Sequence, residues 1–312
     1  MQNKRLEMKK TKGSIMLLFA AFFWGTTFVA QTTASDQIGT FTFNGSRSIV
    51  GAAFLAILIL ARTGMKKQKA KLSGEPVEKE NIKRTVIGGI LCGCVLFFAT
   101  NLQQSGIAAY PEGVASSGRS GFLTATYVVM VAIVSGLLGK KLHKIVYVAV
   151  FVCLGGMYML CMSGGIDNLY FGDLLGLLCA VCFTGHILAV DHFNDCDSVK
   201  ISCIQFITNG VLSLICMAIF EQPAWSDLAA AWFPILYAGI FSSGIAYTLQ
   251  IAGQKYADPA VASIVMSLES VFAVLGGFVV LHEVLAPREI VGCVLVFLSL
   301  IHISEPTRQA EI

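Results

Sequence analysis

The chain has 312 residues, of which 55% are hydrophobic and only 13% are charged, and its mean hydropathy is +0.73. This composition excludes an ordinary water-soluble domain and indicates a protein embedded in a lipid bilayer. The net charge of +3 says less about the protein than the placement of its charged residues does. We expect no nucleic-acid partner.

Apolar runs long enough to cross a membrane, which takes roughly 20 residues, recur along the whole chain. An outer-membrane barrel would instead show alternating segments of about ten residues, so an all-α membrane protein is predicted. The ten predicted transmembrane helices are 14–33, 39–61, 85–107, 113–138, 145–162, 172–190, 199–220, 229–253, 260–281 and 290–303. The last run measures only about 21 Å at 1.5 Å per residue, which predicts a short or truncated final helix.

The basic residues lie mostly on one side of the predicted membrane. With the N-terminus inside, nineteen of the 22 Lys and Arg residues are cytoplasmic: five before Ser14, eight in 62–84, three in 140–144, and Lys200, Lys255 and Arg308. This asymmetry follows the positive-inside rule and predicts that both termini are cytoplasmic. The run 14–33 is longer than a signal-peptide core, so we expect no cleavable signal. The expected location is the cytoplasmic (inner) membrane.

Three polar segments fall outside these spans. Residues 1–13 are basic and are expected to form a disordered cytoplasmic tail. Residues 62–84 are predicted to be a solvated linker, because they are basic and polar. Residues 304–312 differ in composition from the run before them, which suggests a non-native tail.

Polar side chains in the first four spans are the first candidates for function. Trp24 in the first span is expected to be a packing or gate aromatic, and Arg47 in the second to anchor the outer leaflet. Gln103 in the third span and Tyr127 in the fourth are candidates for lining a cavity, although polar side chains also join membrane helices. Arg119 in the fourth span is predicted either to snorkel to the interface or to bind a carboxylate.

The eighth and ninth spans carry the remaining candidates. Tyr247 and Gln250 in the eighth span are again either cavity or packing residues. Glu269 is the one full charge in the ninth span and lies about 14 Å from its start, close to the middle of the bilayer. A carboxylate there costs at least a few kcal/mol in lipid, so Glu269 should face a polar cavity, as a site for substrate or a proton, or pair with an arginine. His186 lies near an interface and is expected to have no functional role.

An internal repeat relates the two halves of the chain. Residues 102, 103 and 106 match residues 249, 250 and 253 at an offset of 147, and residues 114–116 and 120 match 261–263 and 267. The halves are 14–162 and 172–303, with five spans each, and five is odd, so the second half enters the membrane upside down. Inverted repeats are typical of secondary transporters, in which a site at the repeat interface is exposed alternately to each side. At this offset Arg119 and Glu269 should approach a shared axis.

The ten cysteines do not suggest a metal site. Nine lie within predicted spans, where cysteine behaves as a small apolar residue, and the Cys179–Cys182 pair has no second pair beside it. The chain offers no phosphate-binding loop or nucleophile motif either. We therefore expect no metal, no cofactor and no enzymatic activity.

Several short stretches form a recognisable pattern along the chain, namely 24–25, Arg47, 122–124 and 127–129, and most strongly 267–271 with 276–277 and 282–283. In these stretches the chain resembles the EamA-type group of the drug/metabolite transporter superfamily. It covers 14–303 and implies a ten-helix fold with inverted repeats and a cavity lined by the third, fourth, eighth and ninth spans. It also implies export or exchange of small metabolites. The motifs are specific for the family but do not identify its substrate.

The leading prediction is a secondary transporter that exports or exchanges a small metabolite or amino acid by alternating access. It would act as a monomer or a homodimer, with proton coupling as one option. A small-cation multidrug exporter and a lipid-linked sugar flippase share the architecture and stay open: Glu269 favours cations, whereas Arg119 favours zwitterions or anions. A membrane sensor or scaffold is the alternative from another class.

Overall fold

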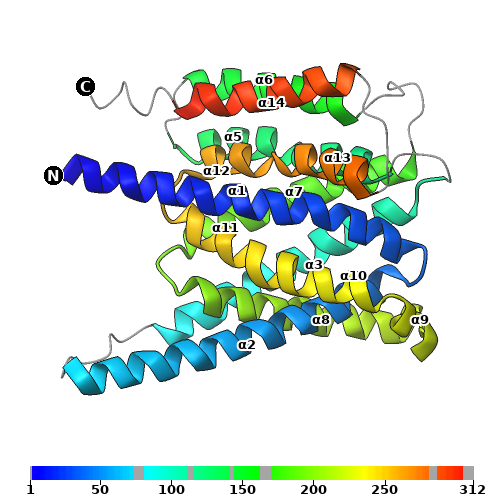
Figure 1. Ribbon diagram of the computed structural model, residues 1–312, viewed down its shortest axis with the longest axis horizontal. Coiled ribbons are helices and arrows are strands. Elements are labelled where there is room, and N and C mark those ends of the chain that lie inside the picture. Colours follow the sequence, from blue (N-terminus) through cyan, green and yellow to red (C-terminus); the bar gives the residue numbers. More distant parts are fainter. Residues whose placement is uncertain are drawn as a thin grey trace.

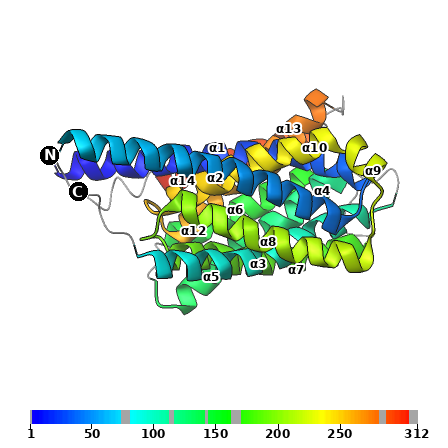
Figure 2. The same cartoon turned by 90° about the horizontal axis from the view of Figure 1, so that it is seen from below.

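The computed structural model describes residues 2–73, 81–111, 116–140, 144–161, 170–280 and 287–304, and every regular element in these ranges is a helix. Eight stretches are long and apolar enough to cross a bilayer, and a ninth helix has a shorter apolar core at Val146–Met159. The long helices run roughly along the longest axis of the molecule (Figures 1 and 2).

The helices supply ten spans, three of which are interrupted. In chain order the elements are α1 (Gln2–Ser35), α2 (Thr40–Ser73), α3 (Ile82–Ala108), α4 (Ser116–Ala125), α5 (Tyr127–Leu137), α6 (Lys144–Cys161), α7 (Phe171–His192), α8 (Ser198–Phe220), α9 (Trp225–Ala230), α10 (Trp232–Tyr237), the π-helix η1 (Ala238–Ala246), α11 (Tyr247–Gln254), α12 (Pro259–Met266), α13 (Glu269–Val280) and α14 (Pro287–Ser304). The fourth span is α4 with α5, the eighth is α10, η1 and α11, and the ninth is α12 with α13.

The main packing contacts between spans are preserved when the two halves of the chain are exchanged. α1 packs on α11 of the eighth span and on both parts of the ninth, α12 and α13, and its counterpart α7 packs on α3 and on both parts of the fourth, α4 and α5. α2 packs on η1, and its counterpart α8 packs on α3. Corresponding spans also pack on each other: α2 on α8, α6 on α14, and the fourth span on the ninth through the α4–α13 and α5–α12 contacts. Figure 1 shows the result as layers, from the α6–α14 pair at one edge to the α2–α8 pair at the other. The fold is therefore two inverted five-helix repeats.

Two glycine contacts show the inversion at single residues. We call the end where α1 begins and α14 ends the N-terminal face, and the end where α1 meets α2 the opposite face (Figure 1). At the opposite face a Cβ on Gly172 would lie 2.6 Å from the Gly106 carbonyl oxygen, and at the N-terminal face a Cβ on Gly13 would lie 3.0 Å from that of Gly253. Gly106 and Gly253 are matched by the sequence repeat, so the two contacts are counterparts. Such close approach is how membrane helices pack without a hydrophobic driving force.

The outer surface of the bundle is apolar. Leu60, Phe151 and Ile57 are 73%, 69% and 68% exposed, and they lie on two different helices, α2 and α6. A water-soluble protein rarely leaves so many large apolar side chains uncovered, whereas lipid solvates them. The chain is therefore a multi-pass membrane protein.

Several expected loops are helical instead. In the predicted disordered tail 1–13, the described residues 2–13 form the first turns of α1, and Gly13 is already packed against Tyr256. The predicted linker 62–84 begins as helix, since α2 continues to Ser73; residues 74–80 lie outside the described ranges. Both segments are rich in Lys, Gln and Met, which are good helix formers, so the preceding or following span simply continues.

The last span is short but longer than predicted. α14 has 18 residues, about 27 Å at 1.5 Å per residue, and packs along α6. The predicted non-native tail, 304–312, lies outside the described residues except for Ser304, which ends α14.

Candidate functional site

A cavity with an empty volume of about 440 Å³ lies at the interface of the two halves. Its lining residues are Trp24, Phe28, Gln31, Arg47, Gln103, Thr124, Tyr127, Phe183, Ile187, Ser242, Tyr247, Gln250, Met266 and Glu269. Seven of the eight residues singled out in the sequence are in this set, and Arg119 is the exception. The first, second and sixth spans contribute to the wall beside the four spans that the family resemblance implied.

The cavity wall follows the symmetry of the repeats. Trp24 and Phe28 on α1 correspond to Phe183 and Ile187 on α7. The correspondence holds because each pair lies the same number of residues after its counterpart glycine, Gly13 on α1 and Gly172 on α7. Because the spacing is four residues in both helices, each pair lies on one helix face. The two halves therefore present equivalent aromatic and aliphatic surfaces to the cavity.

The fourth and ninth spans are both interrupted beside the cavity. In the fourth span Thr126 separates α4 from α5, and its hydroxyl donates to the Leu123 carbonyl; in the ninth span Ser267 does the same to the Ile264 carbonyl before α13 begins. Such bonds from Ser and Thr back to the preceding turn bend helices. The residues that follow the two breaks, Tyr127 and Glu269, meet in the cavity.

Glu269 is the first residue of α13 and is only 5% exposed. The Tyr127 hydroxyl donates to its Oε1 at 3.1 Å. Among the described residues no ion pair includes Glu269, so the alternative that it pairs with an arginine is not what the structure shows. A buried carboxylate without a counter-ion carries a desolvation cost of several kcal/mol, so this group is suited to bind a cation or a proton.

Gly25 lets α1 approach the start of α13. A Cβ at this position would lie 2.4 Å from the Phe272 Cβ and 2.6 Å from the Glu269 carbonyl oxygen. Any side chain at residue 25 would push α13 away from α1. The Trp24–Gly25 pair in the sequence thus places an aromatic ring and the acidic residue beside each other.

Arg47 is a buried cation on the same cavity. It is 2% exposed, its Nε donates to the Asn44 Oδ1 at 2.8 Å, and its guanidinium lies 5.3 Å from the centre of the Phe43 ring. The described ion pairs do not include Arg47. The expected role as an anchor in the outer leaflet does not match this position, because the side chain faces inward. The cavity therefore holds one basic and one acidic side chain that do not form an ion pair with each other.

Tyr247 is the centre of an aromatic cluster in the cavity wall. Its ring lies 4.8 Å from that of Trp24, 5.2 Å from Phe206 and 5.8 Å from His186. Arg47 and Glu269 line the same cavity as Tyr247. The π-helix η1 comes directly before Tyr247, and π-turns of this kind are frequent at functional sites.

An amide cluster closes the cavity toward the opposite face. The Gln31 Nε2 donates to Gln103 Oε1 at 3.0 Å and to Gln104 Oε1 at 3.1 Å, and Gln103 Nε2 donates to Thr124. Gln250, in contrast, has an Oε1 with no hydrogen-bond partner among the described residues. Gln103 is thus held in a fixed network, whereas Gln250 has acceptor capacity to spare.

Arg119 lies away from the cavity, at the opposite face. Its Nε and Nη2 donate to the two carboxylate oxygens of Asp173, at 2.6 and 2.7 Å, and Tyr110 donates to the same carboxylate at 2.9 Å. The Arg119 guanidinium also lies 4.9 Å from the centre of the Tyr170 ring. The expectation that Arg119 approaches Glu269 is therefore wrong: its carboxylate is Asp173, at the start of the sixth span. Burial and the hydrogen bond to Asp173 raise the pKa of Tyr110 above its ordinary value of 10.0.

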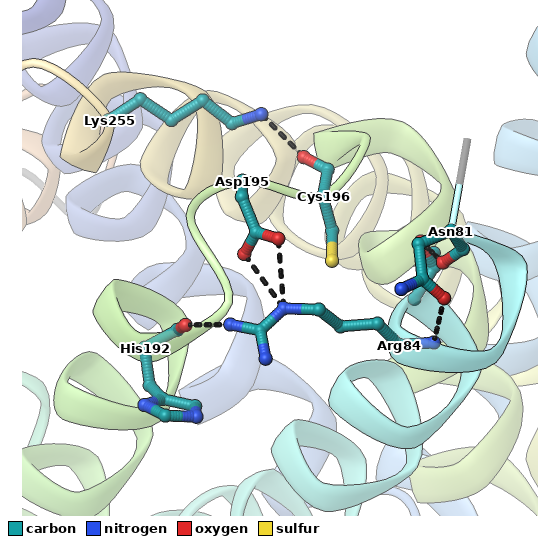
Figure 3. A network of polar contacts seen from close by, with 7 residues as sticks. Asn81, Arg84, His192, Asp195, Cys196 and Lys255 are labelled. Carbon is teal, nitrogen blue, oxygen red and sulfur yellow. Dashed lines mark hydrogen bonds and ion pairs between the residues drawn. The ribbon is translucent and has the colours of Figure 1, made fainter. Parts of the chain in front are cut away.

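A more exposed set of contacts closes the N-terminal face. Arg84, at the start of α3, donates to both carboxylate oxygens of Asp195, at 3.0 and 2.8 Å, and to the His192 carbonyl oxygen (Figure 3). Lys255, just after α11, donates to the Cys196 carbonyl oxygen (Figure 3). The loop between α7 and α8 is therefore joined to both halves of the chain.

Sequence reasoning missed part of the cavity wall. The missed residues are Phe28, Gln31, Thr124, Phe183, Ile187, Ser242 and Met266. A signal existed for some of them, because Trp24, Phe28 and Gln31 recur at helical spacing on one face of the first span. An apolar residue in an apolar span gives no such signal alone.

Comparison with known proteins gives consistent results. The model of the EamA-like transporter family matches residues 11–162 and again residues 170–304. An Archaeoglobus fulgidus protein named "Uncharacterized transporter" is 26% identical over 95% of this chain and 87% of its own length. The Bacillus subtilis proteins "Uncharacterized transporter YoaV" and "Uncharacterized transporter YwfM" are 24% and 26% identical over 90% and 97% of this chain, and over 92% and 97% of their own lengths. A crystal structure of another protein superposes with a TM-score of 0.76 over 97% of this chain and 99% of that chain, at 18% identity, which shows the fold alone.

The family match, the relatives and the apolar helices define a multi-pass membrane transporter, for which a small molecule and a lipid bilayer are the implied partners. Within that class, the chain belongs to the EamA-like transporter family.

Proposed function

We propose that the protein is a secondary active transporter that exports or exchanges small zwitterionic metabolites, amino acids above all, by alternating access. The observation that carries the proposal is one cavity between two inverted repeats that contains a buried basic side chain, Arg47, and a buried acidic side chain, Glu269, with no ion pair between them. Inverted repeats around a midplane site are the architecture of secondary transporters.

The two charges and the aromatic cluster suit a zwitterion. A substrate carboxylate would bind the Arg47 guanidinium, whose donors form a planar fork, and a substrate ammonium would bind Glu269. Trp24 and Tyr247 would pack on the substrate between them.

Glu269 would also couple transport to protons. A proton and a substrate ammonium compete for the same carboxylate, so binding of one releases the other. This competition is the condition for exchange of a proton for substrate. Export would then use a proton gradient, with the N-terminal face in the cytoplasm, as the positive-inside rule predicts.

The alternative of a small-cation exporter is less favoured, because Arg47 would repel a cation in the same cavity. A single chain contains both repeats and the whole cavity, so we propose that a monomer is sufficient for transport. The cytoplasmic membrane is the proposed location.

The proposal is tested with the full chain in proteoliposomes that are loaded with one proteinogenic amino acid at a time, with efflux measured under an imposed pH gradient. We expect efflux of a subset of amino acids that depends on the pH gradient. Arg47→Gln should weaken the apparent affinity by roughly 10- to 100-fold, the loss expected for a charged hydrogen bond. Arg62→Gln is the matched control, because Arg62 lies on the same helix but is exposed and pairs with Asp197. Absence of efflux for every amino acid would contradict the proposed substrate class.

A further inference from the structure

His186 lies directly behind the cavity wall, on the side of the N-terminal face. It is fully buried on α7, next to the cavity residue Ile187, and its ring packs edge-on against Tyr247 at 5.8 Å. Its Nε2 lies 3.1 Å from the Gln205 Oε1 on α8. Its Nδ1 has no hydrogen-bond partner in the part of the chain that the structure describes.

Four more buried polar atoms without described partners lie on α11 and on the neighbouring helix α8. They are Ser202 Oγ, Gln205 Nε2, Gln250 Oε1 and Gln254 Oε1. Each of these side chains is no more than 1% exposed. Gln254 also donates to the Ile187 carbonyl oxygen at 3.1 Å, which joins α11 to α7 beside His186. Together with His186 we call these residues the inner polar cluster.

The inner polar cluster runs from the cavity toward the N-terminal face. Gln250 lines the cavity, and Gln254 lies one turn further along α11, at its end. Gln205 and Ser202 lie in the first turns of α8, which begins at the N-terminal face. Buried polar groups without protein partners are normally hydrogen-bonded to water, and each water needs two to four such groups. The cluster therefore has the composition of a water-filled path.

The other half of the chain has no imidazole at the equivalent position. The residue on α1 that corresponds to His186 is Thr27, whose hydroxyl donates to the Phe23 carbonyl oxygen at 2.6 Å. A hydroxyl that is bonded within its own helix is a poor proton acceptor. The path toward the N-terminal face thus has an ionisable group that its counterpart lacks.

We propose that His186 carries protons between Glu269 and the N-terminal face, through water held by the amide groups of the inner polar cluster. This inference rests on the proposed role of Glu269 in proton coupling. Imidazole suits this task because its ordinary proton affinity lies near neutral pH and its two nitrogens are separate proton sites. Several ionisable groups of the described residues border this region. They are Arg47, Tyr127, Tyr247 and Glu269 in the cavity wall, Cys179 and Cys182 on α7, Cys196 just before α8, Cys203 on α8, and Cys92 on α3.

The proton balance is simple. The Glu269 carboxyl gives its proton through water to His186 Nδ1, which leaves a carboxylate and an imidazolium. The imidazolium then gives one proton to water on the side of the N-terminal face and becomes neutral again. No other reactant is consumed.

The test uses the full chain in lipid nanodiscs and no substrate. After a rapid pH jump, infrared spectroscopy follows the carbonyl band of the protonated Glu269 carboxyl, which is assigned by its loss in Glu269→Gln. We expect His186→Gln, which keeps a hydrogen-bonding side chain but cannot carry a proton, to slow the loss of this band by at least about tenfold, a modest effect for removal of a proton-transfer group. The matched control is His192→Gln, since His192 lies on the same helix but is exposed.

A wild-type rate in His186→Gln would overturn the inference while leaving the proposed transport function intact. Gln205→Leu provides a second variant, because it retains the imidazole of His186 but removes a water-binding amide. It too should slow the loss of the Glu269 carbonyl band. A wild-type protein whose Glu269 band does not respond to pH would overturn proton coupling, and the role of His186 with it. Failure of amino-acid efflux alone would concern only the substrate class.

Discussion

The two faces of the bundle are closed by different chemistry, although their helices are arranged alike. At the opposite face the Arg119–Asp173 pair is buried, with side chains 9% and 6% exposed, whereas at the N-terminal face the Arg84–Asp195 pair is 36% and 56% exposed. Glu221 adds to the opposite face by accepting hydrogen bonds from the Phe41 and Thr42 backbone N–H groups, at the start of α2. The glycine contacts, in contrast, occur at both faces.

The difference in burial between the two ion pairs indicates at which face the helix contacts depend on charge. A buried ion pair contributes little net stability, but loss of one partner leaves the other charge stranded away from water. An exposed pair contributes little in either case. The closed opposite face therefore requires both Arg119 and Asp173, while the N-terminal face is held mainly by packing.

Removal of the Asp173 charge should have the largest effect. Asp173→Asn leaves Arg119 buried beside a neutral amide, which should destabilise the closed opposite face by about 3–5 kcal/mol. Hydrogen–deuterium exchange of the peptides around 105–125 and 170–176 should increase, and the thermal unfolding temperature should fall. The double variant Arg119→Met/Asp173→Leu is the control, and it should recover most of the loss. Equal exchange in Asp173→Asn and wild type would show that the pair does not close this face.

The glycine contacts should matter at both faces. Gly172→Ala and Gly13→Ala each place a methyl group within 3.0 Å of backbone or ring atoms, and overpacking of this kind costs about 1–3 kcal/mol. Gly172→Ala should be the more harmful, because its new Cβ would meet the Gly106 carbonyl oxygen at 2.6 Å. Thermal unfolding of the two variants measures the difference. Gly64→Ala, where no atom lies within 4 Å, is a control that should not destabilise the protein. A tolerated alanine at both Gly13 and Gly172 would contradict the close helix packing at the two faces.

The smallest effect is expected at the exposed pair of the N-terminal face. Arg84→Gln should cost at most about 1 kcal/mol, the usual limit for a surface ion pair. Partial burial alone would raise the pKa of Asp195, but the hydrogen bonds from Arg84, a backbone hydrogen bond and the charges of Arg84 and Lys255 together lower this pKa below its ordinary value of 3.8. The pair therefore contributes stability above that value and loses it as the pH falls through the lowered pKa. The free energies of unfolding of Arg84→Gln and wild type should therefore converge as the pH falls through this acidic range. A difference that stays constant with pH would contradict a stabilising role of the Arg84–Asp195 pair.

Inspection of the sequence was a good guide to the spans and to the cavity, for a physical reason. A charged or polar side chain in an apolar helix tends to face something other than lipid, which is why Glu269, Tyr127, Tyr247 and Gln250 could be selected in advance. Gln103 followed from the same reasoning. Lengths of apolar runs likewise predicted the ten spans.

Partners across the fold were harder to predict. Arg119 and Asp173 lie 54 positions apart (173 minus 119) and in different halves, so spacing along a single helix gives no information about them. The ungapped repeat led to Arg119 as the neighbour of Glu269, whereas the helix breaks at Thr126 and Ser267 make Tyr127 its neighbour. Arg47 was placed at the lipid boundary because its inward orientation depends on Asn44 and Phe43, which the sequence alone does not position.

The measurement closest to the central claim is proton-coupled flux through Glu269→Gln in liposomes. The amide keeps the size of the carboxyl group and can still accept from Tyr127, so the variant should remain folded. We predict that an imposed pH gradient no longer drives substrate efflux in this variant, and that any remaining exchange is independent of pH. Retention of wild-type flux with an unaltered pH dependence would contradict the role of Glu269 and, with it, the proton-coupled transport proposed for this protein.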